Sequence, residues 1–202
     1  YAAQTSKKIR AVWQMKAASG KRISSTVPYG YMKSSEDKEK WIIDEEAAEV
    51  VRRIFSLSLA GRGIAQIARQ LEQEKILIPT AYKIKKGLST THKYPEKPYY
   101  WDPATVAGII DNRQYTGCTV NFKTTTVSYK VHKVIHKSED EQQIIPNTQD
   151  AIITEDLWLR VQELRQHKRR PTSTGRTSLF SGLVYCPDCG AKLHFAAAKS
   201  MT

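Results

Sequence analysis

The sequence predicts an α+β fold in which a helix-turn-helix-like pair of helices is combined with small antiparallel strands. Several segments bounded by Gly, Pro or Asp carry apolar residues at helical spacing. Between Tyr115 and Ile145, Val, Ile, Tyr and Thr alternate with Lys and His, which is typical of half-buried strands. The chain has 202 residues, of which 40% are hydrophobic, enough to fill one core with a smaller appendage.

The charge balance predicts a polyanionic partner. The chain has 32 Lys and Arg against 20 Asp and Glu, a formal net charge of +12. No apolar run approaches the roughly 20 residues that cross a bilayer, and no signal-peptide pattern opens the chain. The chain has only three cysteines, so we do not expect a framework of disulfide bonds to hold the fold together. We therefore expect a soluble protein of the reducing cytoplasm.

The first element is a basic amphipathic helix over residues 2–18. Ile9, Val12 and Trp13 share one face of this helix, and that face requires a partner. No acidic residue precedes Glu36, so the stretch has a local positive excess that a phosphate backbone would neutralise. Its basic residues are Lys7, Lys8, Arg10, Lys16, Lys21, Arg22 and Lys33.

Two short strands and a core helix follow. Residues 21–27 are expected to be extended, and 28–31 form a turn into the first strand, with the second at 41–43. Asp44 is the expected cap of the next helix, with acidic residues in its first turn. The buried stripe of this helix consists of Ala47, Val50, Val51, Ile54 and Phe55. A shorter helix from Ile64 places Ile67, Ala68 and Leu71 on one face.

The second half of the chain begins with residues 80–100, which are rich in Lys and Tyr and are predicted to form a long exposed loop. Asp102 and Pro103 then start a helix that extends to Asn112. Two or three strands follow, with a polar tip at 138–141. A last helix begins at the Thr154 cap and is expected to bury Leu157, Trp158, Val161 and Leu164.

The helix from Ala65 and the helix from Pro103 are similar to a helix-turn-helix with an expanded connection. In such a unit the second helix enters the major groove. If Val106, Ile109 and Ile110 face inward, the outer face of this helix carries side chains that can read base edges. Those outer residues are Ala104, Thr105, Gly108, Asp111 and Asn112, with Arg113 and Gln114 at the end. Two ordinary core helices would explain the same pattern.

Basic stretches with interleaved aromatics are a second indication of nucleic-acid binding. Lys and Arg neutralise phosphates, while Tyr donates a hydrogen bond to a phosphate or stacks on a sugar. One such stretch can be a solvated surface, but the chain has three. The candidate DNA contacts are Lys7, Lys8, Arg10, Lys21, Arg22, Ser24, Tyr29, Tyr31, Arg62, Ala104, Thr105, Asn112, Arg113, Gln114 and Lys123.

Cys186 and Cys189 frame a Cys-Pro-Asp-Cys-Gly sequence that predicts half of a zinc site, because two thiolates three positions apart can share one tetrahedral zinc. Cys118 is remote and His194 follows too closely to complete the ligand set. A redox pair is the alternative reading of these two cysteines. No catalytic residue is assigned, since the paired carboxylates lie where helix capping and solubility explain them.

The order of motifs along nearly the whole chain resembles one family. The motifs are Gly20-Lys21-Arg22, Val27-Pro28-Tyr29-Gly30-Tyr31, Ile43-Asp44-Glu45-Glu46-Ala47, Val51-Arg52-Arg53-Ile54-Phe55, Gly63-Ile64-Ala65-Gln66-Ile67-Ala68, Trp101-Asp102-Pro103-Ala104-Thr105-Val106, Ile110-Asp111-Asn112-Arg113-Gln114-Tyr115-Thr116-Gly117, Ala151-Ile152-Ile153-Thr154 and Leu179-Phe180-Ser181-Gly182-Leu183-Val184-Tyr185-Cys186-Pro187-Asp188-Cys189-Gly190. This order is similar to the C-terminal region of the large serine recombinases, the integrases and transposon resolvases of phages and mobile elements.

The resemblance implies a domain plan and a function. Residues 1–20 would end the long helix from a missing catalytic domain, 21–168 would form the recombinase domain, 169–178 a linker, and 179–202 the start of a zinc ribbon. The catalytic serine would lie in the absent domain, so this chain would bind one half of an attachment site in duplex DNA without cutting it. We expect it to be a monomer, whereas the full-length protein would hold zinc and act as a dimer or tetramer on DNA.

Two other classes of protein fit the same residues. A helix-turn-helix transcription regulator would also bind duplex DNA, but it would normally carry its own dimerisation surface. An RNA-binding protein fits the charge and the tyrosine content equally well, and it should prefer single strands or A-form duplexes.

Overall fold

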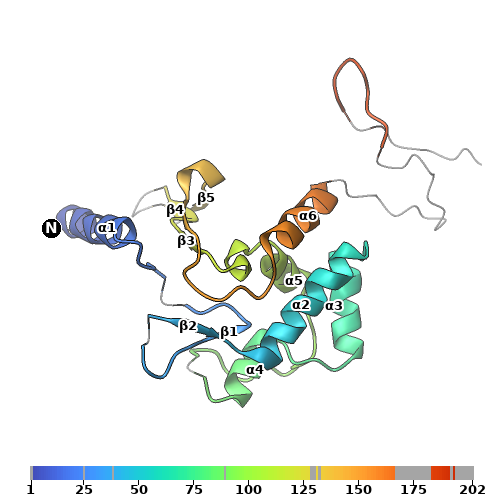
Figure 1. The fold of residues 1–202 in the computed structure, drawn as a ribbon, viewed down its shortest axis with the longest axis horizontal. Helices are drawn as coiled ribbons and strands as arrows, with labels where there is room; N and C mark the ends of the chain where they lie inside the picture. Colours follow the sequence, from blue (N-terminus) through green and yellow to red (C-terminus); the bar gives the residue numbers. More distant parts are fainter. Residues whose placement is uncertain are drawn as a thin grey trace, which may run out of the picture.

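The structure is a computed structural model that describes residues 2–24, 26–37, 39–88, 90–127, 131, 133–166, 183–191 and 193. It confirms the predicted α+β class, with helices and three small antiparallel sheets (Figure 1). The helices are α1 (Ala2–Ala18), α2 (Glu45–Leu59), α3 (Ile64–Gln73), α4 (Pro79–Lys85), α5 (Pro103–Ile110) and α6 (Glu155–Gln166), with 3₁₀ turns η1 (Arg113–Thr116) and η2 (Glu139–Glu141). The strands are β1 (Tyr31–Lys33), β2 (Trp41–Ile43), β3 (Thr119–Asn121), β4 (Thr124–Thr126), β5 (Val134–His136) and β6 (Gln143–Ile145).

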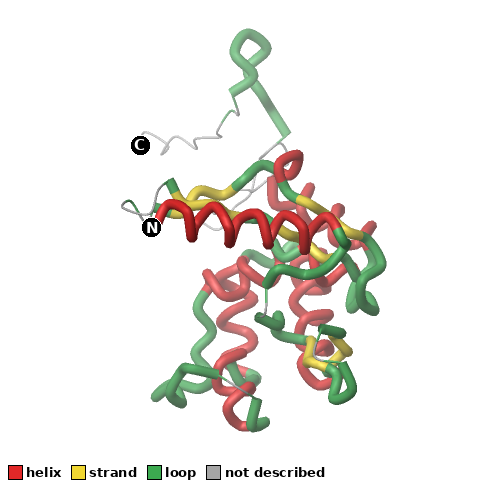
Figure 2. The backbone as a smooth tube through the Cα atoms, turned by 90° about the vertical axis from the view of Figure 1, so that its left-hand side faces the viewer, coloured by secondary structure: helices red, strands yellow, loops and turns green. Residues whose placement is uncertain are grey.

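The three sheets each contain two antiparallel strands. β1 pairs with β2, β3 with β6, and β4 with β5. In the first sheet Tyr31 lies opposite Ile43, so the hairpin returns the chain directly to the start of α2. Figure 2 shows α1 crossing one side of the molecule beside strands, away from the main group of helices.

The core is centred on α2, which packs against α3, α5 and α6. Val51, Ile54 and Phe55 are fully buried, as the apolar stripe predicts. Trp101, just before α5, and Tyr115, in η1 after it, add the largest buried side chains. Since α3 and α5 pack directly against each other, the predicted helix pair exists.

Three local expectations are corrected. The predicted 80–100 loop contains α4, which Pro79 opens at its first turn. Asp44 occupies the position before α2 but makes no side-chain cap, because its carboxylate accepts hydrogen bonds from Tyr82 and Lys86 instead. Leu157 is only partly buried and Leu164 is 45% exposed, so α6 buries a narrower stripe than predicted.

The long tail is described in part. Residues 183–191 and 193 form a small knuckle, and the predicted linker over 169–178 lies outside the described residues. In the described part of the chain, no helix is both long and apolar enough to span a membrane.

Candidate nucleic-acid interface

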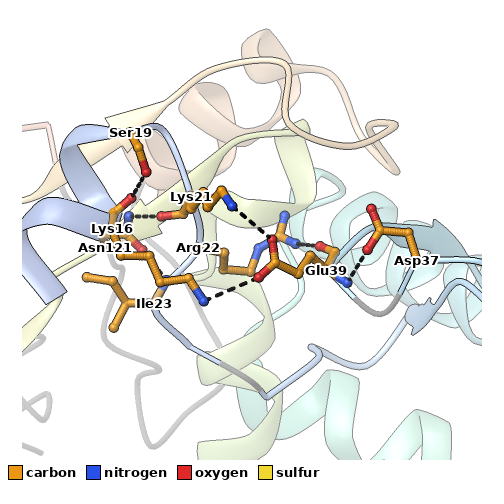
Figure 3. Close-up of polar contacts among 8 residues, drawn as sticks. All are labelled: Lys16, Ser19, Lys21, Arg22, Ile23, Asp37, Glu39 and Asn121. Carbon is orange, nitrogen blue, oxygen red and sulfur yellow. Dashed lines mark hydrogen bonds and ion pairs between the residues drawn. The ribbon is translucent and has the colours of Figure 1, made fainter. Parts of the chain in front are cut away.

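The end of α1 is fastened to the β3–β6 sheet through backbone groups. Gln143 donates a hydrogen bond from Nε2 to the Ala17 carbonyl at 3.0 Å. Asn121 donates to the Lys21 carbonyl at 3.0 Å and accepts from the Ile23 backbone N–H at 3.1 Å (Figure 3). We call these five residues, together with Arg22, the arm joint. The joint fixes the start of the segment that follows α1, residues 21–24, which carries the predicted DNA contacts Lys21, Arg22 and Ser24 and which we call the arm.

Arg22 is the centre of the arm joint. Its guanidinium carbon lies 3.5 Å from the centroid of the Trp41 ring. It donates to the Glu39 carbonyl and to Thr119 Oγ1, each at 3.0 Å, and also to Gln149. Burial lowers the pKa of Arg22. Arg22 therefore holds the arm to the domain, and this internal role was missed because an arginine in a basic run suggests a phosphate contact.

An open hollow of about 550 Å³ lies between the end of α1 and the β1–β2 hairpin. Its wall carries five cations and two carboxylates: Lys16, Lys21, Arg22, Lys33 and Lys40 against Asp37 and Glu39. Glu39 is shared, since Lys16 lies 3.5 Å and Lys21 3.9 Å from its two carboxylate oxygens. The hollow keeps a positive excess and also includes the predicted contact Ser24, which is exposed.

The predicted contacts on α1 face solvent. Lys7, Lys8 and Arg10 are exposed. Val12 and Trp13 on the same helix are 57% and 48% exposed, so the apolar face that requires a partner is uncovered in the described structure. Arg62, immediately before α3, is also exposed. These four cations are available to a phosphate backbone.

The beginning of α5 has the geometry expected of a helix presented to a ligand. Asp102 Oδ1 accepts a hydrogen bond from the Ala104 N–H at 2.7 Å, which caps the helix. Val106 is fully buried, as predicted, while Ala104 is exposed and Thr105 is partly exposed. Ala104 and Thr105 thus remain candidates for contact with bases.

The end of α5 differs from the prediction. Asn112 Oδ1 accepts from the Gln114 N–H at 3.4 Å and from Lys123 Nζ at 2.7 Å. Gln114, a predicted DNA contact, is only 7% exposed and does not lie on the outer face of the helix as expected. Burial lowers the pKa of Lys123, whose ammonium lies inside this network. The Asn112–Lys123 pair therefore stabilises the turn after the helix.

Arg113 is also directed into the protein. It forms ion pairs with Glu155 on α6 and with Glu139, the latter at 3.8 Å. Its guanidinium carbon lies 5.4 Å from the centroid of the Trp158 ring. The hydrogen bond from Arg113 to Glu155 is the main cause that raises its pKa. Arg113 ties η1 to α6 rather than extending from the surface.

Tyr29 and Tyr31 were both predicted as DNA contacts, but the structure places both rings in the core. Tyr29 is 7% exposed and packs edge-on against Tyr82 with 5.5 Å between ring centroids. Tyr31 is 2% exposed and donates a hydrogen bond to the Asp150 carbonyl at 2.7 Å. Burial raises the pKa of Tyr31 to about 12. The sequence pattern did not separate these tyrosines from exposed ones.

Cys186 and Cys189 lie on a tight knuckle. The Gly190 N–H donates to the Cys186 carbonyl at 2.9 Å, and the Cys186 N–H donates to the Ala191 carbonyl at 2.8 Å. Backbone N–H groups of Cys189 and Asp188 lower the pKa of the Cys186 thiol, which favours the thiolate that zinc requires. Among the described residues no group of three or more His, Cys, Asp or Glu is placed to hold a metal. Cys186 and Cys189 are thus two candidate ligands without a described third.

Sequence reasoning missed a surface beside α5. Lys97 and Tyr100 line a hollow of about 340 Å³ together with Thr80 and Thr105. The available signal was a Tyr-rich loop that ends directly at the buried Trp101, a position from which the loop must lie next to the helix start.

Comparison with known proteins gives one family and two solved structures. The model of the family described as Recombinase matches residues 45–168. The fold is similar to that in the crystal structure of an LSR–DNA complex, with a TM-score of 0.54 at 17% identity over 91% of this chain and 47% of that chain. A structure concerned with the sequence requirements of the Listeria innocua prophage attP site has a TM-score of 0.46 at 20% identity over 91% of this chain and 62% of that chain. The chain spans about half of the first of these relatives and less than two thirds of the second.

Proposed function

The chain belongs to the Recombinase family, and from that premise we propose that it binds duplex DNA sequence-specifically at one half of an attachment site for site-specific recombination. One observation carries the proposal: an uncovered basic surface and an exposed helix start occur on the same fixed framework. The basic hollow holds five cations against two carboxylates, and the first turn of α5 leaves Ala104 and Thr105 accessible. Phosphate contacts would position the protein, and α5 would read base edges.

The relatives support the same assignment. The similar fold, at a TM-score of 0.54, was determined as a complex with DNA. The whole protein is, in this proposal, a serine site-specific recombinase in which this chain supplies DNA recognition and another domain supplies the chemistry. The chain alone would bind DNA as a monomer on a half-site, and the whole protein would assemble as a dimer or tetramer on DNA.

A salt titration tests the DNA-binding proposal. The chain is titrated against a duplex carrying the end sequence of its parent element, with a scrambled duplex of equal length beside it. We expect a preference for the element end that persists at physiological salt, while affinity for both duplexes falls steeply as salt rises. Equal affinity for both duplexes at every salt concentration would overturn sequence-specific binding.

Two competing functions are separated by related measurements. An RNA-binding protein should prefer an A-form duplex or a single strand to the B-form duplex in competition. A transcription regulator should form a dimer in sedimentation equilibrium and bind a palindrome without a catalytic domain. The similarity to an LSR–DNA complex favours the recombinase assignment over both.

We also propose that zinc binds the Cys186–Cys189 knuckle in the full-length protein, with two further ligands supplied from elsewhere. Zinc would cross-link the tail and supply folding free energy, with no part in bond cleavage. The metal content of the full-length protein tests this. We expect about one zinc per chain, lost in Cys186→Ser, whereas equal zinc in the two proteins would exclude the knuckle as a ligand.

A further inference from the structure

The connection between α4 and α5 exposes three tyrosines. Tyr94 is 51%, Tyr99 40% and Tyr100 52% exposed. Exposed tyrosines of this kind suit a binding surface, because the ring packs against a ligand while the hydroxyl donates a hydrogen bond. Lys93 and Lys97 lie in the same loop and are exposed, with Glu96 between them. The loop thus combines aromatic surface with a positive balance.

This loop is held in place at its end. The Ile78 N–H donates to the Pro98 carbonyl at 2.9 Å, which ties the loop to the start of α4. The Trp101 indole donates to the Ile76 carbonyl at 2.9 Å, and this side chain is only 1% exposed. The Tyr100 N–H donates to the Lys97 carbonyl at 3.2 Å, which closes a turn. A surface fixed in this way loses little conformational entropy when it binds a ligand.

The loop is continuous with the first turn of α5. The 340 Å³ hollow is lined by Lys97 and Tyr100 from the loop, Thr80 from α4, and Thr105 from α5. Three of these four residues carry hydroxyl donors and the fourth carries an ammonium group. Asp102 also lines the hollow, but its Oδ1 already accepts the capping hydrogen bond from Ala104. The charges of Lys97 and Asp102 cancel, and the hollow offers an anionic ligand four donor groups, of which the Lys97 ammonium is the charged one.

We propose that Lys97 and Tyr100 bind a backbone phosphate of the DNA strand that passes the first turn of α5, and so set the register in which Thr105 reads its base pair. This inference rests on the proposed function and adds a positioning site that the basic arm does not contain. A phosphate contact carries no sequence information directly, but it fixes the orientation from which a neighbouring side chain reaches a base. A DNA duplex provides both groups: a backbone phosphate for Lys97 and Tyr100, and a base edge for Thr105.

Two loop variants and one control test the inference. Lys97→Gln removes the charge, Tyr100→Phe removes the hydroxyl, and Arg160→Gln removes an exposed charge from α6. In Figure 1, α6 lies on the opposite side of the domain from α4, so Arg160 is a matched control. Binding is measured by fluorescence anisotropy on a labelled duplex selected from a pool with a randomised central segment, at several salt concentrations.

We expect Lys97→Gln to reduce the slope of log affinity against log salt by about 1, the loss of one phosphate contact. Tyr100→Phe should weaken binding about fivefold, as for one lost hydrogen bond. Combining Tyr100→Phe with Thr105→Val should give a loss that differs from the product of the single losses, because the two residues act on one register. Arg160→Gln should bind as the parent protein does, and all variants should keep the parent's unfolding midpoint.

The possible outcomes are distinct. Loop variants that bind like Arg160→Gln, with a parent protein that binds the selected duplex, overturn this inference and leave the proposed function standing. A parent protein that selects no duplex from the pool overturns both. A parent protein that prefers an A-form RNA duplex in competition, with loop variants weakened on that RNA, also overturns both, since the phosphate would then belong to a different partner.

Discussion

The two ends of α5 use similar polar residues for opposite purposes. At its beginning, the Asp102 cap satisfies the helix while Ala104 and Thr105 remain accessible beside an open hollow. At its end, Asn112 and Arg113 direct their side chains to partners within the protein. Residue type alone therefore does not identify a base-reading side chain. The difference lies in whether neighbouring elements supply partners that compete with DNA.

The reason is visible in what packs against each end. The end of α5 and the turn after it meet α6, through the Gln162 hydrogen bond to the Ile110 carbonyl and the Arg113–Glu155 ion pair, and they also meet Lys123, which lies between β3 and β4. Buried polar groups need such partners, because leaving one unsatisfied costs about 1–3 kcal/mol. The beginning of α5 follows a loop in which Tyr99 and Tyr100 are exposed. If this comparison is correct, substitutions at the two ends should separate into effects on stability and effects on recognition.

The largest expected effect is a loss of stability caused by a substitution on the buried face of α5. Ile110→Ala should lower the free energy of unfolding by about 2–5 kcal/mol, because the side chain is fully buried and its removal leaves a cavity. Urea denaturation measures the change. Ala104→Ser on the exposed face is the control and should change stability by less than about 0.5 kcal/mol. Equal effects would mean that α5 is not oriented as described.

A smaller loss of stability is expected from Arg113→Ala. The change removes the ion pairs to Glu155 and Glu139 and the contact with Trp158, which should cost about 1–3 kcal/mol. Binding should weaken alike for all DNA sequences, to the extent that the domain unfolds. A changed preference at one base pair would show that Arg113 reads DNA after all and would break the comparison.

In contrast to Arg113→Ala, Thr105→Val should leave stability unchanged and alter the preference for one base pair. The shapes of the two side chains match and the residue is only partly buried, so the unfolding midpoint should stay where it is. Discrimination at one base pair should fall by about 1–3 kcal/mol. Competition binding with duplexes that vary one base pair at a time provides the measurement. Uniform weakening over all of these duplexes would identify Thr105 as a phosphate contact instead.

The smallest expected effect is at Gly108, on the exposed side of α5. A Cβ added here would meet no described atom within 4 Å. Gly108→Ala should therefore stabilise the domain by about 0.5–1 kcal/mol, since glycine is a poor helix former. The added methyl should weaken DNA binding if this face lies close to the groove. Stabilisation with unchanged affinity would place the DNA nearer to the first turn of the helix.

Much of the fold follows from the sequence because apolar periodicity reports burial directly. Ala47, Val51, Ile54 and Phe55 of α2 and the inward residues of α5 are buried as predicted, whereas Val50 is only partly buried. Pro79 opens α4, but the lysines and tyrosines that follow suggested a loop, and packing of Ala81 and Tyr82 into the core decides the outcome. The local sequence pattern gives no information on this packing between residues far apart in the chain.

The candidate site was less predictable, since polar side chains can serve either the core or the surface. Tyr31 and Tyr100 have the same chemistry and both lie near basic residues, yet they are 2% and 52% exposed. Arg22 illustrates the same difficulty, because its partners Thr119 and Gln149 lie about a hundred residues further along the chain. Partners so distant in sequence leave no short-range signal.

Because the arm joint holds the C-terminal end of α1, a small rotation there produces a larger displacement at the N-terminal end of the helix. The helix has 17 residues and is about 25 Å long. It is fixed at one end by Gln143, Asn121 and the Arg22 contacts. A rotation of about 10° at that joint would move the far end by about 4 Å over this length. Any small rearrangement of the joint on binding is thereby converted into an ångström-scale displacement at the first turn of the helix.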